Sequence, residues 1–499
     1  MEKISSIGLK GLEGYKIQVE VQVFSGSPSM VIVGLPDKSI KESRERILTV
    51  LRSVESTITT RKVIVNLSPA EHKKNGPLLD FAIAIGILKE LKILNNEMEE
   101  GVAFLGAMSL DGTLLSTEDL LSTILAAKSL NYKKVYLPYD PNIPLEIIEG
   151  IELIFFKDIY TAIDYFQGKK IKNEILQQHN KYHPTHLTPH KSFSYIIGHE
   201  KAKRALEIAA SGEHNVLLIG SPGCGKTLLA EAFPTILPPL SNKSLLEVMS
   251  LYQLAGERRT AHSTPPFRSP HHSSSSVSLI GGGSFPKPGE ISLSHKGVLF
   301  LDEMAEFPKK SLEMLRQPLE SGIVSISRVQ SKVSYPSSFI LIGATNPCPC
   351  GYHGSKHHYC ICSPQQIKNY RNKISGPVND RIDIFLHLHS SNQETMVQES
   401  EDSRMIRSRV EIARKRQYIR YKTEQTNGKV AIEELLATSP LTKNQEQWLV
   451  TLSLKHHWSN RVKLKIIRLA RTISDLQNQA VITDEAIKEA ISLRNGSLY

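Results

Sequence analysis

Residues 220–227 read GSPGCGKT, a spacing of glycine, lysine and threonine that could bind phosphate groups. They follow the apolar run 216–219 and precede LLAEAF, so we expect a strand, a glycine-rich turn and a helix N-terminus in that order. The glycines let backbone N–H groups approach phosphate oxygens, Lys226 adds a positive charge, and Thr227 offers a hydroxyl ligand for Mg²⁺. We predict that ATP and Mg²⁺ bind to Gly220, Ser221, Pro222, Gly223, Cys224, Gly225, Lys226 and Thr227. Cys224 is small enough to fit in this loop without a redox role.

Two adjacent carboxylates follow a second apolar run. Residues 298–303 read VLFLDE, which predicts a buried strand ending in Asp302 and Glu303. Asp302 would hold Mg²⁺, and Glu303 would orient or deprotonate the attacking water. A buried strand ending in acids is common, but its position about 75 residues after the phosphate loop makes the pair a strong candidate.

Two further polar residues could contact the terminal phosphate. Asn346 ends the apolar run in FILIGATN (339–346), where its amide could position the water. Arg381 lies in GPVNDRID (376–383), just before another strand-like run. An arginine at this place could reach the nucleotide of a neighbouring subunit, or it could be an ordinary surface or structural residue.

Four of the five cysteines lie in NPCPCGYHGSKHHYCICSP, residues 346–364. Four thiolates in two pairs are enough for tetrahedral zinc, although a single residue within each pair is a tighter spacing than usual. The predicted ligands are Cys348, Cys350, Cys360 and Cys362. One thiolate could be replaced by His353, His357 or His358. Redox chemistry and packing without a metal are the alternatives.

Length and composition bound the class of protein. The 499 residues are too many for one hydrophobic core and predict two to four domains. The chain is 40% hydrophobic and 22% charged, and we expect it to be soluble and cytoplasmic, because no secretion signal or membrane-spanning run is seen. A net charge of +11 suits a nucleic-acid partner but is weak evidence by itself.

The elements that would position these residues fall into three regions. Residues 1–167 predict an α/β domain, with strands at 63–67, 102–105 and 134–137 and helices at 39–53 and 79–91. The polar, His- and Lys-rich residues 168–192 predict a linker. Residues 193–392 predict a parallel sheet with helices on both faces, and residues 393–499 predict a helical domain.

The motifs together resemble the AAA+ ATPases. The stretch FRSPHHSSSSVSLIGGGSFPKPGEISLSHKGVLFLDE is similar to the Mg-chelatase-like AAA+ family of bacteria (YifB/ComM type). The resemblance extends over essentially the whole chain through GLPDKSIKESRERI, NPCPCG, SGPVNDRID and RLARTISDL. It implies a Lon-protease-like (ribosomal-S5-like) α/β N-terminal domain, an AAA+ core and a helical C-terminal lid. Members of the family are hexameric motors, and the competence-associated member is a DNA branch-migration helicase.

The resemblance also implies roles for single residues. Lys226 and Thr227 correspond to Walker A, Asp302 and Glu303 to Walker B, and Asn346 to sensor 1. Arg381 corresponds to an arginine finger that acts on the neighbouring subunit. Arg461 matches the sensor 2 arginine of the lid, with Arg468 and Arg471 as rivals.

About 70 residues separate the phosphate-loop helix from Asp302, more than a simple crossover needs. The glycines and prolines of IGGGSFPKPGEISL predict a hairpin. By resemblance to related ring ATPases, Lys287 on this hairpin is a candidate pore residue. His271 and His272 could be metal ligands or ordinary polar residues of a loop.

The N-terminal domain is similar to the domain of Lon-type proteases, which use a serine and a lysine. Leu78 stands where the serine would follow Gly-Pro, and Leu121 where the lysine would be. Neither side chain can do that chemistry. The domain is therefore predicted to be a scaffold for partner binding or ring assembly.

Residues 404–422 carry eight Lys or Arg and one Glu, with Tyr418 and Tyr421 among them. They could form a solvated lid helix or contact phosphates of a nucleic acid. The preferred function is an ATP-driven, ring-forming DNA translocase, with a hexamer implied by the resemblance. It would act on branched or single-stranded DNA by branch migration or helicase activity, in recombination or natural transformation. The alternatives are a protein-remodelling motor, as in chelatase subunits or MoxR-type chaperones, and a scaffold that nucleotide merely switches.

Overall fold

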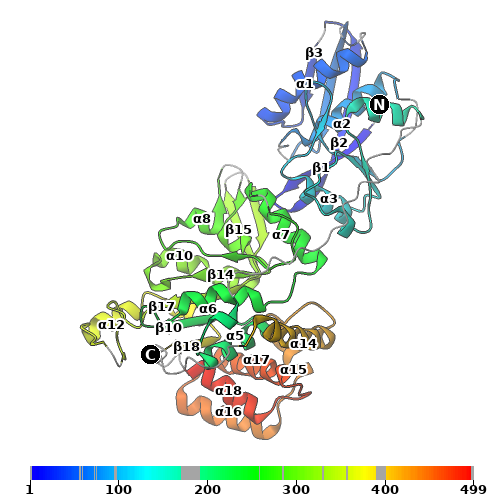
Figure 1. Ribbon diagram of the computed structural model, residues 1–499. Helices are drawn as coiled ribbons and strands as arrows, with labels where there is room; N and C mark the ends of the chain where they lie inside the picture. The colour runs from blue at the N-terminus through cyan, green and yellow to red at the C-terminus, as the bar shows by residue number, and fades with distance from the viewer. Residues whose placement is uncertain are drawn as a thin grey trace. The chain divides into compact units, whose positions relative to one another are not determined.

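A computed structural model describes residues 3–169, 192–388 and 401–495, apart from 28, 56–57, 59, 72–73, 75, 95–97, 258, 284–285, 329–330 and 356–357. These residues form two compact units (Figure 1). The first contains residues up to 169 together with 245–261, and the second contains the remainder from 192 onward. Most of the predicted linker 168–192 and the predicted boundary at 392–393 lie outside the described residues, so these boundaries stay predictions.

The first unit contains a four-stranded sheet in the order β1 (Lys3–Lys10), β2 (Glu13–Ser25), β4 (Arg61–Ser68) and β3 (Ser29–Val33). Strand β3 runs parallel to β4, which requires the crossover helix α1 (Lys38–Val54). Asp37 caps this helix by accepting a hydrogen bond from the Ile40 N–H at 2.9 Å. The apolar sequence of α2 (Asp80–Glu90) explains why residues 80–88 of this helix are all buried.

A second sheet in this unit joins β5 (Val102–Phe104), β8 (Lys134–Leu137) and β9 (Glu152–Phe155) in parallel. Helices α3 (Leu120–Ser129) and α4 (Ile159–Phe166) connect and follow these strands, and β6 (Ala107–Met108) pairs with β7 (Leu114–Leu115). Aromatic rings pack between the elements, for example Phe104 stacked on Tyr136 with centroids 4.9 Å apart. The predicted α/β composition of this region is confirmed.

The second unit is organised by a five-stranded parallel sheet. Its order is β11 (Phe267–Arg268), β14 (Val298–Leu301), β17 (Ile340–Thr345), β10 (Val216–Gly220) and β18 (Ile384–Leu388). Because parallel strands end at the same edge, the residues that follow β10, β14 and β17 are brought together there. That edge carries the phosphate loop, the two acids and Asn346, in keeping with the predicted parallel sheet.

Helices of the second unit lie before and between these strands. They are α5 (Glu200–Gly212), α6 (Lys226–Ala232), α8 (Ser276–Ile280), α9 (Glu290–Leu293), α10 (Lys309–Met314), α11 (Arg316–Ser321), α12 (Pro364–Arg371) and α13 (Gly376–Asn379). Helix α7 (Asn242–Ala255) follows α6 in the chain, and its residues from Leu245 onward belong to the first unit. The hairpin expected before Asp302 is present as β12 (Gly281–Gly282) and β13 (Lys287–Pro288). A second hairpin, β15 (Ile323–Arg328) with β16 (Ser331–Pro336), was not expected.

The C-terminal region is helical, as predicted. It consists of α14 (Ser403–Tyr421), α15 (Ile432–Thr438), α16 (Lys443–His456), α17 (Asn460–Leu476) and α18 (Asp484–Asn495), orange to red in Figure 1. One hydrophobic core runs from the strands through α5 into α14, α17 and α18. The helical region is therefore packed on the sheet domain through buried apolar side chains.

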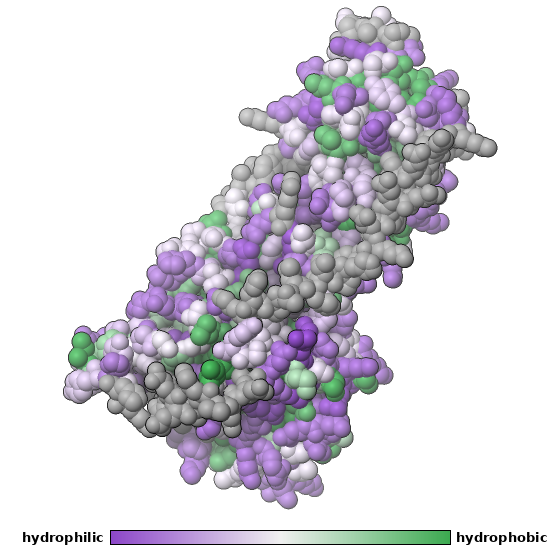
Figure 2. All heavy atoms as spheres, in the orientation of Figure 1, coloured by the Kyte–Doolittle hydropathy of each residue, from purple (hydrophilic) through white to green (hydrophobic). Residues whose placement is uncertain are grey.

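Within the described residues, no helix combines the length and the apolar content that crossing a bilayer requires. Among the residues coloured in Figure 2, hydrophilic ones predominate and hydrophobic ones form only small areas.

Candidate functional site

The phosphate loop is a turn between β10 and α6, as its glycine spacing predicts. Gly223 and Gly225 have φ angles of 77° and 85°, a region that favours glycine. The Lys226 ammonium donates hydrogen bonds to the carbonyls of Gly220 at 2.7 Å and Ser221 at 3.0 Å, and to Asn346 Oδ1 at 3.1 Å. Burial lowers the pKa of this lysine. Lysine and amide therefore meet where a phosphate would bind.

The two acids lie beside this loop. Thr227 Oγ1 donates a hydrogen bond to Asp302 Oδ2 at 3.0 Å, so a hydroxyl and a carboxylate oxygen form a pair of hard ligands of the kind that Mg²⁺ prefers. Glu303 has a left-handed backbone with φ of 48°, and its N–H donates to Asp302 Oδ1 at 2.9 Å. A non-glycine residue in this region is uncommon and often marks a functional site.

Cys224 lies at the back of the loop. It is buried, and burial raises the pKa of its thiol, so it is not an activated thiolate. A Cβ at Gly220 would lie 2.5 Å from Cys224 Sγ and 2.8 Å from the Leu388 carbonyl. The contact explains why glycine is needed at the end of β10.

His272 lies next to Glu303, with 3.5 Å between Nδ1 and Oε2. His271 instead pairs with the Ser273 hydroxyl at 2.7 Å. In the part of the chain that the structure describes, neither histidine belongs to a group of side chains arranged to hold a metal. The sequence predicts a loop position for both histidines. It does not predict that His272 approaches Glu303, because that is a tertiary contact.

Arg381 and Arg461 make their contacts outside the phosphate loop, as far as the described residues show. Arg381 forms an ion pair with Glu320, with 2.6 Å between Nη2 and Oε2. Arg461 is exposed near the beginning of α17. Among the residues described, neither arginine hydrogen-bonds to residues 220–227. A role at a neighbouring subunit's nucleotide is compatible with this placement.

Arg468 and Arg471, the alternatives to Arg461, form hydrogen bonds and an ion pair within the second unit. Arg468 donates to the carbonyls of Asn427 and Val430. Arg471 is fully buried, and it pairs with Asp475 at 2.9 Å and bonds to the carbonyls of Gln479 and Ala480. These bonds stabilise the helical region and leave Arg461 as the accessible candidate.

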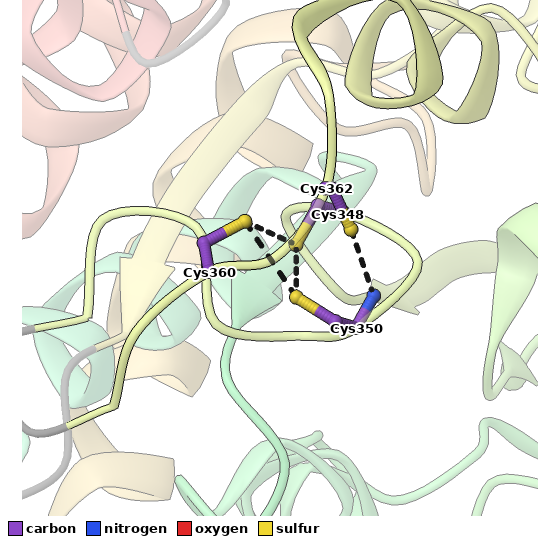
Figure 3. A group of neighbouring side chains, drawn as sticks. All are labelled: Cys348, Cys350, Cys360 and Cys362. Atoms are coloured by element: carbon purple, nitrogen blue, oxygen red, sulfur yellow. Dashed lines mark hydrogen bonds between the residues drawn. The ribbon is translucent and has the colours of Figure 1, made fainter.

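The four predicted cysteines come together in one group (Figure 3). Cys348 Sγ lies 3.3 Å from Cys350 Sγ and 3.7 Å from Cys360 Sγ. Cys362 Sγ accepts a hydrogen bond from the Cys350 N–H, and all four sulfurs lie within 4.8 Å of one another. A hydrogen bond from the Tyr352 backbone lowers the pKa of Cys350 to about 6.

The two described histidines near this group, His353 and His358, do not join it. His353 contributes only its backbone N–H, which donates to Cys348 Sγ at 3.3 Å, and the His358 N–H bonds to Ser355. His357 lies outside the described residues. Four soft sulfur donors at these separations fit Zn²⁺.

The cysteine loop touches the phosphate loop. Gly351 has a φ of 85°, and a Cβ added there would lie 2.6 Å from Pro222 Cδ. Asn346 Cγ would be 3.9 Å from the same position. The cysteine group is therefore part of the nucleotide site's surroundings.

Most arginines of α14 are paired within the second unit. Arg409 pairs with Glu207 and Glu401, Arg414 with Glu213, and Arg420 with Asp475. The Tyr421 hydroxyl is buried and donates to Asn427 Oδ1 at 2.6 Å. Many positive side chains of 404–422 therefore form ion pairs that hold α14 against the second unit. These side chains are not available to phosphates.

The two hairpins of the second unit are joined, because the Tyr335 hydroxyl donates to the Pro286 carbonyl at 2.5 Å. Lys287 and Lys332 on them are exposed. The hairpins therefore present ammonium groups to solvent.

In the first unit, Leu78 and Leu121 are buried at 3% and 0% exposure. The two leucines therefore belong to the core.

Three family models match the chain. The model "Magnesium chelatase, subunit ChlI" matches residues 192–396 and "Subunit ChlI of Mg-chelatase" matches residues 19–141. The model "Magnesium chelatase, subunit ChlI C-terminal" matches residues 400–494. Together they span the sheet domain, most of the first unit and the helical region.

Curated relatives match over nearly the full length. The protein YifB of Salmonella typhimurium is 34% identical over 490 residues, covering 97% of this chain and 95% of YifB. The competence protein ComM of Haemophilus influenzae is 33% identical over 492 residues, with the same coverage of both chains. A Lon protease of Buchnera aphidicola is 29% identical over 171 residues, 32% of this chain and 22% of the protease.

Proposed function

Because the chain belongs to the Mg-chelatase-like AAA+ ATPase family that includes YifB and ComM, we propose that it is an ATP-hydrolysing, ring-forming motor that acts on DNA. The observation that best supports ATP hydrolysis is that the ends of strands β10, β14 and β17 lie together. Lys226 contacts Asn346, and Thr227 contacts Asp302, at the carboxyl edge of one parallel sheet. This arrangement provides for a triphosphate and a hard cation.

Each residue would have a distinct role with ATP bound. Lys226 would exchange the carbonyls of Gly220 and Ser221 for phosphate oxygens, which attract its charge more strongly. Thr227 and Asp302 would hold Mg²⁺, which would neutralise charge on the phosphates. Glu303 would accept a proton from the attacking water, and Asn346 would orient that water.

We expect Arg381 and Arg461 to add to the charge of Lys226 by acting on the nucleotide of a neighbouring copy, because among the described residues neither arginine hydrogen-bonds to the phosphate loop of its own chain. Such an arginine stabilises the charge that develops in the transition state. Hydrolysis would then require assembly, with a hexamer expected from the family resemblance.

The DNA part of the proposal is supported by the full-length similarity to a competence protein and by the net charge of +11. The two joined hairpins, with exposed Lys287 and Lys332, are the candidate contacts. Because most arginines of α14 are already paired, the hairpins are better placed than that helix to contact a phosphate backbone.

A second candidate is a protein-remodelling motor. The observation that favours it is that all three matching family models take their name from a magnesium chelatase subunit. Such a motor would use the same nucleotide site but would be stimulated by a protein partner. The two candidates therefore differ in what accelerates hydrolysis.

The test is the ATPase rate with and without four-way junction or single-stranded DNA. We expect several-fold stimulation by DNA that falls steeply as salt rises. Lys226→Ala is the control and should remove both basal and stimulated hydrolysis. Stimulation only by a protein partner would overturn the DNA proposal and support the second candidate.

Cys348, Cys350, Cys360 and Cys362 would hold a structural Zn²⁺, whose bonds would fix the loop between Asn346 and α12. Cys360→Ser is expected to lower ATPase activity and assembly by about tenfold while nucleotide binding remains, since ligand loss weakens such sites strongly. Metal analysis of freshly purified protein should find one zinc per chain. A chain purified without zinc would contradict the proposal.

A further inference from the structure

Glu320 is an exposed carboxylate in an unfavourable place on its own helix. It is the second-last residue of α11, where the helix dipole presents its negative end. Arg381 approaches it to 2.6 Å, and this hydrogen bond is the main cause of the lowered pKa of Glu320. The carboxylate is therefore held at this position by arginine from another element.

The surroundings of Arg381 favour the binding of an anion. Its side chain is only 10% exposed, and its Nε has no hydrogen-bond partner in the structure. A guanidinium removed from water needs an anion, preferably one that accepts several of its donors. One oxygen of Glu320 uses only part of this capacity.

The charges of two more arginines act on the same carboxylate. Arg316 precedes Glu320 by four residues on α11, which puts both on one side of the helix. Arg461 precedes Lys465 by four residues on α17, and Lys465 binds Asp383 at 2.6 Å and the Ile382 carbonyl at 3.0 Å, next to Arg381. The charges of Arg461 and Arg316 both act on Glu320.

We propose that Glu320 occupies, in the free chain, the place that the terminal phosphate of ATP bound to a neighbouring copy takes in the assembly, and that Arg316 joins Arg381 and Arg461 in binding that phosphate. This inference rests on the proposed function. A phosphate carries more charge and more acceptor oxygens than a carboxylate, so three arginines favour the exchange. Glu320 then competes with assembly, and Arg316 is a phosphate-binding residue.

The experiment measures the ATPase rate per chain against protein concentration, with light scattering in a slowly hydrolysed ATP analogue as a second readout of assembly. Glu320→Gln removes the charge and keeps the shape. We expect about a 2- to 5-fold lower protein concentration at half-maximal rate, the effect of one exposed ion pair, and an unchanged rate at saturating protein. Arg316→Gln should lower the saturating rate about tenfold or more.

Glu313→Gln is the matched control, since Glu313 is also exposed and has no ion pair among the described residues. If Glu320 orients Arg381 within the assembled site, Glu320→Gln lowers the saturating rate, and the proposal is wrong. An unchanged concentration dependence, or an Arg316→Gln variant as fast as the wild type, also overturns it. A wild-type chain without ATPase activity at any concentration would instead contradict the proposed function itself.

Discussion

In the second unit, polar side chains stand at the ends of three parallel strands, whereas the first unit has buried Leu78 and Leu121 at the positions that we predict from the sequence for the serine and lysine of a Lon-type protease. Both regions resemble parts of known enzymes. Lys226 bonds to Asn346 and Thr227 bonds to Asp302, but the two leucines are buried apolar side chains. The comparison teaches that a retained fold does not carry its chemistry with it, since chemistry depends on the side chains at the site.

The largest effect should come from Glu303→Gln. The amide cannot accept the proton of the attacking water, so we expect the hydrolysis rate to fall about 100- to 10,000-fold. ATP affinity should change little, because Lys226 and Thr227 are intact. Single-turnover hydrolysis and equilibrium binding of a fluorescent ATP analogue measure the two quantities. A variant with normal function would favour the alternative in which nucleotide only switches a scaffold.

In the first unit, the corresponding experiment should change stability alone. Leu121→Ala removes a fully buried side chain, and we expect the free energy of unfolding of this unit to fall by about 2–5 kcal/mol. Leu110→Ala is the control, because Leu110 is 63% exposed. Both tryptophans, Trp448 and Trp458, belong to the second unit, so urea unfolding followed by circular dichroism should shift while tryptophan fluorescence should not. If Leu121→Ala lowered ATPase activity as much as Glu303→Gln does, the prediction that only the second unit carries out catalysis would be wrong.

The second unit should show its own pH dependence. His214 is buried against Thr472, and burial lowers its pKa from 6.5 to about 4. The unfolded chain therefore binds the proton more readily, so stability is complete above pH 6.5 and falls by about 3 kcal/mol as pH drops toward 4. Urea unfolding followed by tryptophan fluorescence at several pH values measures this loss. His214→Gln should remove the dependence, and if it persists unchanged, other groups cause it.

A smaller effect tests the contact between the cysteine loop and the phosphate loop. Gly351→Ala places a Cβ against Pro222, so we expect ATP to bind about 3- to 10-fold more weakly, about 1 kcal/mol. Gly354→Ala is a matched control, because its φ of 77° imposes the same backbone strain but nothing lies within 4 Å. Equal effects of the two substitutions would show that strain, and not the contact with Pro222, is responsible.

The sequence predicted the elements whose signal is local. The strand at 216–219, the glycine-rich turn and the apolar run before Asp302 needed only neighbouring residues, and the parallel sheet followed from them. The hairpin at 323–336 was missed, although its alternating apolar residues on either side of a short turn are a typical signal. Glu320 and His272 could not be predicted, because their partners are 61 and 31 residues away in the chain.

The basic segment 404–422 illustrates the same limit. Charge spread around a helix is compatible with solvent, nucleic acid or buried pairing, and composition does not distinguish them. Only the tertiary structure shows that Arg414 and Arg420 meet Glu213 and Asp475. The four cysteines were predictable as a group because short spacing brings each pair together by itself.

The hydrophobic core that continues from β10 and β18 through α5 into α17 has a mechanical consequence. Apolar side chains packed without a break make the sheet and the helical region a stiff body that resists internal hinge motion. In the ring that we propose, hydrolysis at the phosphate loop would therefore bend this body little. We expect it instead to rotate one whole subunit against the next, so that movement would occur at the interfaces between subunits.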